Sequence, residues 1–296
     1  MITNGAPLVV LLSGGRDSVC LLHRAVQAGA RVTALHVNYG LRPEADEDER
    51  FCRALCDRLG VDLVVERAEW RGEGNLQAWA REVRYAAAAR LAGEDGDIAA
   101  GHTATDQAET ILYRLAASPG RRALLGMAPR EGRVVRPLLT MTREETAAYN
   151  EAHGLEWRED ASNDSPAFAR NRVRHGLLEE LRAVHPAAEA NLLRTAELLR
   201  DEAAVLDDVV DTALRGRDTI PLATLAALPR ALARLVVRRL AEDATGGFCP
   251  RAAGRLDDVL ALADGSLDLG DGARVVVADG VLRMDRTPPL PSPRRR

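Results

Sequence analysis

Apolar and polar positions follow two different patterns along the chain, and the first pattern occupies roughly its first half. Up to about residue 154, short apolar runs rich in valine, leucine and alanine alternate with stretches whose apolar residues recur every three or four positions. Such alternation predicts βαβ units and a mostly parallel sheet covered by helices on both faces. The expected strands are 8–12, 30–38, 61–65, 97–102 and 134–135, and the expected helices are 19–26, 44–59, 76–91, 105–116 and 142–154.

After about Pro186 the strand signals give way to long helical stretches. Helices are expected over 187–213, 228–241 and 252–263, followed by short β-like segments at 266–269, 274–277 and 281–284. The turns between these segments, Asp271-Gly272 and Asp279-Gly280, are typical of tight hairpins. The sequence therefore predicts a parallel-sheet α/β domain at 1–185, a second, mainly helical domain ending in a small sheet at 186–287, and a disordered tail at 288–296.

The length, the amino-acid composition and the net charge of the chain exclude some kinds of active site and of binding partner. The chain has 296 residues, 46% of them hydrophobic, which is enough for one large domain or two moderate ones. All 40 of its basic Lys and Arg positions are arginine, so no lysine can form a Schiff base, serve a phosphate loop or pair with a catalytic serine. The net charge of −4 does not attract nucleic acid over long range, although local arginine clusters can.

The apolar runs and the cysteine positions indicate the cellular location and the redox chemistry to be expected. No apolar run is long enough to span a membrane and no basic-then-apolar leader opens the chain, so a cytoplasmic protein without membrane contacts is expected. The four cysteines, Cys20, Cys52, Cys56 and Cys249, form no C-x-x-C pair. Cys52 and Cys56 are four residues apart, which favours a buried helix face over metal or redox use. The oligomeric state is left open, and a homodimer is one of the states that the sequence allows.

The most informative stretch, Ser13-Gly14-Gly15-Arg16-Asp17-Ser18, directly follows the first expected strand. Its glycines allow positive φ and a close backbone approach, and its serines and Asp17 can cap the next helix or bind a ligand. The N–H groups at a helix start, with the positive end of the dipole, form a site for phosphate. The string resembles the pyrophosphate loop of the N-type ATP pyrophosphatases, which split ATP between the α and β phosphates. A nucleotide-binding PP-loop ATPase domain is therefore expected over 1–185.

The second stretch, 101–110, follows the fourth expected strand. His102, Asp106 and Glu109 are spaced four and three residues apart, so they can share one helix face at the carboxyl edge of the sheet. A histidine with two carboxylates there could bind Mg²⁺, receive an amino group or move a proton. The alternative is that Thr103 or Thr105 caps the helix while the two carboxylates favour its dipole.

The third stretch is an acidic loop at 158–164 that leads into a basic helix start at 169–175. Its arginines could bind phosphates of ATP or RNA. The alternative is a solvated basic helix paired with the acidic loop.

Together these stretches resemble the tRNA(Ile)-lysidine synthetase family. The family carries S-G-G-x-D-S, G-H-x-x-D-D-Q-x-E-T, G-[LM]-x-G-M, R-P-L-L and E-D-x-S-N followed by R-N-x-x-R. In this chain the matching positions are 13–18, 101–110, 124–127 (in part), 136–139, 159–163 and 170–174, and 36–42 also fits. The motifs cover roughly residues 8–180 in the family's order.

The resemblance implies a two-step reaction. ATP adenylates the C2 oxygen of the wobble cytidine in tRNA(Ile) with a CAU anticodon, and pyrophosphate leaves. The amino group of free L-lysine then displaces AMP to give lysidine. The second domain would bind the tRNA.

The resemblance also assigns roles to particular residues. Asp17, His102, Asp106 and Glu109 form the implied catalytic set, in which Asp17 and Asp106 help to place Mg²⁺ and the other two, with Asp106, receive lysine and help to deprotonate its amine. ATP or pyrophosphate would be bound by Ser13, Gly14, Gly15, Arg16, Asp17 and Ser18. Contacts with phosphate or tRNA are implied for Arg81, Arg84, Arg170, Asn171 and Arg174.

Two departures from the family pattern put single contacts in doubt. The usual Asp-Asp-Gln is Thr105-Asp106-Gln107, so the chemistry falls to Asp106, which keeps the spacing to His102 and Glu109. The usual Arg-Gly-Ser-Gly loop is replaced by 116–120, which loses an arginine and gains a proline. Arg121 and Arg122 are candidates to compensate.

Three other classes of protein compete with this interpretation. A tRNA cytidine thiolase needs paired cysteines or an iron–sulfur cluster, and the chain has no C-x-x-C. GMP, NAD and asparagine synthetases share only the loop. A non-catalytic nucleotide- or RNA-binding module has no need for carboxylates near the phosphates.

Overall fold

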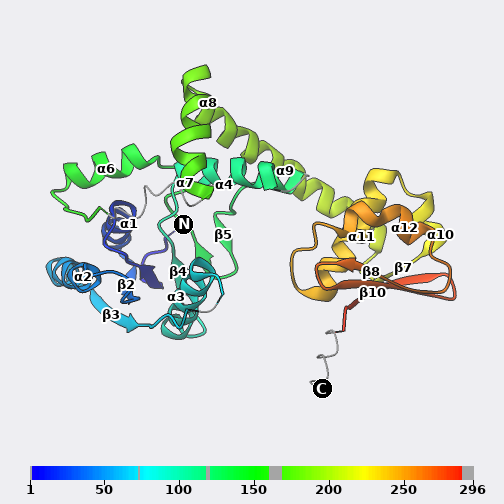
Figure 1. Ribbon diagram of the computed structural model, residues 1–296, viewed down its shortest axis with the longest axis horizontal. Coiled ribbons are helices and arrows are strands. Elements are labelled where there is room, and N and C mark those ends of the chain that lie inside the picture. Colours follow the sequence, from blue (N-terminus) through cyan, green and yellow to red (C-terminus); the bar gives the residue numbers. More distant parts are fainter. Residues whose placement is uncertain (1, 73, 118–120, 160–168, 289–296) are drawn as a thin grey trace. The chain divides into compact units, whose positions relative to one another are not determined.

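The computed structural model describes residues 2–72, 74–117, 121–159 and 169–288. The chain divides into two compact units, Met1–Glu197 and Leu198–Arg296 (Figure 1). The division falls inside helix α9 (Ala188–Leu214), later than the boundary after residue 185 that the sequence predicts. The first turns of α9 belong with the first unit because Leu192 and Leu193 pack against Leu112 and Leu178.

The first unit is built on a six-stranded sheet with the order β3-β2-β1-β4-β6-β5. Strands β1 (Pro7–Leu11), β2 (Arg31–Asn38), β3 (Asp62–Arg67), β4 (Asp97–Ala99) and β6 (Val134–Val135) are parallel, as predicted. The two-residue β5 (Arg130–Glu131) is antiparallel and was not predicted, because two exposed polar residues carry no strand pattern. Strand β4 is shorter than expected, so residues 101 and 102 lie beyond the sheet.

Helices cover both faces of this sheet, which confirms the predicted fold class. Alternate β1 residues face opposite sides: Leu8 and Val10 belong to one apolar cluster, and Val9 and Leu11 to another. The first cluster lies under α1 (Arg16–Gln27), α2 (Ala45–Leu59) and α6 (Arg143–Ala152), and the second lies under α3 (Leu76–Ala92). Cys52 and Cys56 are on the buried face of α2, as expected.

Three helical segments complete the first unit around the carboxyl edge of the sheet. Helix α4 (Ala104–Ala117) follows β4, and the short α5 (Arg121–Leu124) comes next. Helix α7 (Ala169–Arg172) continues into the π-helical turn η2 (Val173–Leu178) and then into α8 (Glu179–Val184). Leu178 packs against Ala108 and Leu112 of α4, which turns the basic face of α7 and η2 toward α4. π-helical turns are rare and are frequent at functional sites.

The second unit combines helices with an antiparallel sheet of order β7-β10-β9-β8 (Figure 1). After α9 come β7 (Thr219–Pro221), α10 (Leu222–Ala227), α11 (Arg230–Thr245), the 3₁₀ turn η3 (Ala252–Arg255), α12 (Leu256–Leu260), β8 (Gly265–Gly270), β9 (Ala273–Ala278) and β10 (Val281–Arg286). Both Asp-Gly turns have positive φ at both residues, as a tight hairpin of this type requires. Strand β7 and helix α10 were not predicted. No helix in the described part of the chain is both long and apolar enough to cross a membrane.

Candidate active site

The phosphate loop follows β1 and leads directly into α1. Gly14 has φ +85°, and an added Cβ there would lie 3.3 Å from side-chain atoms of Phe51 and Cys52. The Ser18 hydroxyl donates to a loop carbonyl at 2.8 Å and accepts from the Ser13 N–H at 3.2 Å. The loop is thereby held in a tight turn at the first turn of α1, which is the geometry that presents backbone N–H groups to an anion.

Asp17 lies in the first turn of α1 and is held there by α6. Its Oδ1 accepts from the Thr146 hydroxyl at 2.5 Å and from Arg16 Nε at 3.1 Å. Asn150 of α6 donates to the Arg16 carbonyl at 2.9 Å. Sequence reasoning identified Asp17 but missed Thr146 and Asn150, because single polar residues on a distant helix carry no signal of their partners.

Gly101 brings the chain after β4 against the backbone of α1. A Cβ at Gly101 would lie 3.3 Å from the carbonyl carbon and oxygen of Asp17 and 3.4 Å from the backbone nitrogen of Ser18. Any larger residue would push the two segments apart. Steric space therefore explains why a glycine precedes His102 in the second motif. His102 follows at the point where the backbone comes close to α1.

His102 is half-buried and is electrically neutral at pH 7. Burial lowers its pKa to about 4; Asp106 opposes this shift, and the positive charges of Arg170, Arg136 and Arg84 add to it. Its Nδ1 is buried and has no hydrogen-bond partner among the described residues. An unpaired buried ring nitrogen costs free energy unless a ligand or water completes it, so His102 is a candidate contact for a bound ligand.

The low pKa of His102 predicts how stability depends on pH. An unfolded histidine titrates near 6.5, so between about pH 4 and 6.5 the unfolded chain binds a proton that the folded chain does not. The free energy of unfolding therefore rises with pH across this window, by at most about 1.4 kcal/mol per pH unit for one proton. We expect His102→Asn to flatten this part of the curve in denaturant titrations. Equal slopes in His102→Asn and the wild type would contradict the assignment.

Asp106 lies in the first turn of α4 and faces two arginines at the same time. Thr103 precedes the helix, and its hydroxyl accepts from the Asp106 N–H at 3.2 Å, which is the capping role that the sequence offered as an alternative. The Oδ2 of Asp106 accepts from the Thr103 N–H at 2.8 Å and lies 3.1 Å from the Thr103 hydroxyl. Its Oδ1 is 3.1 Å from Arg170 Nη2 and 3.5 Å from Arg174 Nη2. Burial alone would raise the pKa of this carboxyl, but Arg170 and the Thr103 N–H hold the pKa of Asp106 below its usual range.

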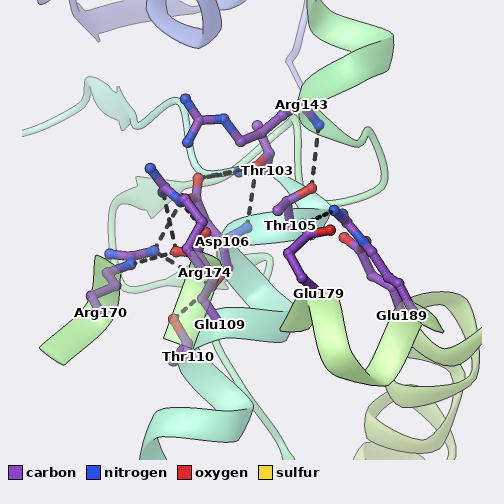
Figure 2. Close-up of polar contacts among 11 residues, drawn as sticks. Thr103, Thr105, Asp106, Glu109, Thr110, Arg143, Arg170, Arg174, Glu179 and Glu189 are labelled. Atoms are coloured by element: carbon purple, nitrogen blue, oxygen red, sulfur yellow. Dashed lines mark hydrogen bonds and ion pairs between the residues drawn. The ribbon is translucent and has the colours of Figure 1, made fainter. Parts of the chain in front are cut away.

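Glu109 is fully buried and shares both arginines with Asp106 (Figure 2). Its Oε1 accepts from Arg174 Nε at 2.5 Å, and its Oε2 accepts from Arg170 Nε at 2.9 Å and from Arg174 Nη2 at 3.2 Å. The sequence predicted all four residues, with the carboxylates receiving lysine or Mg²⁺ and the arginines receiving phosphate or RNA. The structure brings them together as ion pairs with one another.

Arg143 is a candidate site residue that sequence analysis did not identify. It begins α6, and Figure 2 draws it with Asp106 and Arg174. Its side chain is in the range of the charges of these two residues and of Arg16 and Asp17. Burial and the two neighbouring arginines lower its pKa. Among the described residues, no acceptor contacts its guanidinium group. The only signal in the sequence was its place in the first turn after a capping box.

The carboxylates fit Mg²⁺ only in part. The Oδ1 of Asp17 is occupied by Thr146 and Arg16, but its Oδ2 has no partner in the described part of the chain. Both oxygens of Asp106 are engaged. Within the described residues, no group of three or more His, Cys, Asp or Glu side chains is arranged to hold a metal. Since Mg²⁺ commonly takes one or two carboxylates together with substrate phosphates, Asp17 fits such a role as it stands.

The remaining predicted contacts lie on α3 and α7. The Arg81 and Arg84 guanidinium groups are 4.6 and 5.8 Å from the ring centroid of Tyr85. Arg84 is close enough to lower the pKa of His102, whereas Arg81 lies on the exposed surface. Asn171 is buried on α7. Most of the predicted stretches at 159–163 and 116–120 lies outside the described residues.

The fold and the site define an α/β protein with an anion-binding loop at the carboxyl edge of its sheet. A family model described as a PP-loop domain matches residues 3–181. This match covers more than half of the chain, and the chain therefore belongs to the PP-loop family.

Curated relatives of similar sequence are named tRNA(Ile)-lysidine synthase. The chain is 43% identical to the one from Thermus thermophilus over 80% of this chain and 48% of that protein. It is 39% identical to the one from Solibacter usitatus over 89% of this chain and 62% of that protein. The chain thus spans about half to three fifths of the length of these relatives. Among solved structures, the U34-tRNA thiolase NcsA from Methanococcus maripaludis is similar in fold, with a TM-score of 0.56 and 17% identity over 67% of this chain and 73% of that chain.

Proposed function

We propose that this protein joins free L-lysine to the wobble cytidine of tRNA(Ile) with a CAU anticodon, using ATP and Mg²⁺ and releasing pyrophosphate and AMP. In the first step the cytidine C2 oxygen bonds to the α-phosphorus of ATP, and the bond to the β-phosphate breaks. In the second step the cationic amine first gives a proton to the carboxylate of Asp106 or Glu109, and the neutral nitrogen bonds to C2. The C2–O bond breaks with AMP as the leaving group, and the nitrogen then loses its second proton to water.

One observation carries the proposal. The carboxyl ends of the neighbouring strands β1 and β4 place the phosphate loop next to the cluster of His102, Asp106 and Glu109. Arg174 and Arg143 both lie within range of the charges of Asp17 and Asp106, so the two halves form one electrostatic site. The first step requires a loop that binds the leaving pyrophosphate, and the second step requires carboxylates that bind the amine nearby. The similarity to named tRNA(Ile)-lysidine synthases supports the choice of substrates.

The backbone and side-chain groups of the site have different roles in this reaction. The N–H groups of Ser13 and Gly15 donate to serine hydroxyls within the loop, so the other loop N–H groups and the Arg16 side chain bind the β and γ phosphates. Asp17 holds Mg²⁺, which neutralises charge on the phosphates when bound. Asp106 and Glu109 bind the cationic amine and place it. With a pKa of about 4, His102 is a weak base, so its task is to accept or donate a hydrogen bond at Nδ1 rather than to take up the amine proton. Arg81, Arg84 and Asn171 are proposed contacts for the tRNA backbone, and the second unit is proposed to bind the tRNA outside its anticodon.

The direct test is transfer of labelled lysine to RNA. The protein is incubated with ATP, Mg²⁺, labelled lysine and a tRNA(Ile) transcript with a CAU anticodon. We expect label in the RNA, and none when the wobble cytidine is replaced by uridine or when ATP is omitted. Repeated turnover of pyrophosphate release that depends on tRNA but not on lysine would instead indicate a thiolase-like reaction, and the absence of both lysine transfer and pyrophosphate release would indicate a binding module.

A further inference from the structure

The two carboxylates that the proposed reaction assigns to the amine are already occupied. Glu109 has no exposed surface and accepts three hydrogen bonds from Arg170 and Arg174. One carboxylate oxygen of Asp106 accepts a hydrogen bond from Thr103, and the other accepts one from Arg170. An ammonium group approaching these oxygens would also meet two guanidinium charges. In this form of the protein, the amine site is closed.

The charges at the site favour a different partner for the arginines. The guanidinium groups of Arg16, Arg143, Arg170 and Arg174 outnumber the carboxylates of Asp17, Asp106 and Glu109 by one, and His102 is neutral. The surplus is the charge of Arg143, whose guanidinium group has no acceptor in the described part of the chain. The site therefore attracts an anion, and guanidinium groups bind phosphate oxygens in the same two-pronged way as carboxylates.

The position of the phosphate loop brings such an anion within reach of the same arginines. Asp17, in the first turn after the loop, acts electrostatically on both Arg174 and Arg143. Arg170 is 44% exposed on its side chain, so it can change partners without unpacking the core.

We propose that Arg170 and Arg174 exchange acceptors when nucleotide binds. Without nucleotide they pair with Asp106 and Glu109 and keep the amine out. With phosphates in the loop, and with Arg143 holding the same anion, they turn to phosphate oxygens and leave the two carboxylates to the amine. The nucleotide thus opens the amine site, and lysine binds after ATP. This inference rests on the proposed function in taking the amine to be lysine.

The exchange has a thermodynamic consequence that can be measured in the wild-type protein. Because coupling between two ligands is reciprocal, nucleotide must tighten lysine binding by the same factor as lysine tightens nucleotide binding. Titration calorimetry with lysine, in the absence and presence of saturating α,β-methylene-ATP and Mg²⁺, measures this factor. We expect lysine binding at least about tenfold tighter with the nucleotide analogue. Equal affinity in the two states, or no lysine binding in either, would overturn the exchange.

Two variants and a matched control separate the exchange from general electrostatics. Arg170→Gln and Arg174→Gln each remove one competitor, so lysine binding without nucleotide should become tighter and the enhancement by nucleotide should shrink. Arg130→Gln breaks a similar pair, with Asp97 at the amino end of β4, and should leave both affinities unchanged. Weaker lysine binding in Arg170→Gln without nucleotide would count against the proposal. If lysine is transferred to tRNA but binds equally with and without nucleotide, only the exchange fails; if no lysine is transferred to tRNA, the proposed function fails.

Discussion

Replacing Glu109 by leucine will lower the free energy of unfolding by about 3 kcal/mol, because the substitution leaves two guanidinium groups beside a buried, uncharged side chain. Glu109 is fully buried, and Arg174, its main partner, is 16% exposed on its side chain. A buried pair that loses one member costs much more than a surface pair, since the remaining charge keeps its desolvation penalty. Urea unfolding followed by circular dichroism measures the change.

A double variant tests the cause of this loss. If the unpaired charge is responsible, Glu109→Leu combined with Arg174→Met should regain about half of the lost stability, since a buried ion pair can be replaced by apolar groups at small cost. Two losses that simply add would show that the pair contributes little and that Glu109 acts through its packing alone.

The second large effect concerns Asp17. Asp17→Asn keeps the shape of the side chain but removes the charge that faces Arg16 and the oxygen that fits Mg²⁺. We expect pyrophosphate release in the presence of tRNA and lysine to fall by about 100-fold or more, because the change removes electrostatic stabilisation at the transferring phosphoryl group. The rate is measured with a coupled pyrophosphate assay at saturating ATP.

The matched control for Asp17→Asn is Asp97→Asn, which removes a carboxylate paired with Arg130 at the opposite end of a neighbouring strand. It should retain a rate close to that of the wild type. If both variants lose activity to the same extent, net charge or stability explains the loss, and the role proposed for Asp17 is wrong.

The sheet and its helices could be predicted because local patterns determine them. The alternation of Leu8, Val9, Val10 and Leu11 between two helix-covered faces follows from the period of a strand. The Thr142 capping box sets the start of α6 and is present with both of its hydrogen bonds. The parts that were missed are very short, such as β5 and β7, and receive their pairing from neighbours rather than from their own residues.

The composition of the site could be predicted better than its pairing. Asp17, His102, Asp106, Glu109, Arg170 and Arg174 were all singled out from the sequence, and the structure brings them together or links them through charge. Their partners depend on contacts between segments 61 to 65 residues apart, which no local pattern encodes. Arg143 was missed for the same reason, since its surroundings come from α1, α4 and η2.

The close approach of Gly101 to the first turn of α1 restricts movement of the phosphate loop relative to the start of α4. The arginine side chains of α7 and η2 are not restricted in this way. An added Cβ at Gly101 would lie 3.3 Å from the Asp17 backbone, so the close packing of these segments couples the position of the phosphate loop to that of the start of α4. Segments α7 and η2 contact α4 through the side chains of Arg170 and Arg174, and each of these side chains has several rotatable bonds. We therefore expect ligands of different size to be accommodated by rotation of the arginine side chains, with a smaller change in the distance between the loop and the carboxylates.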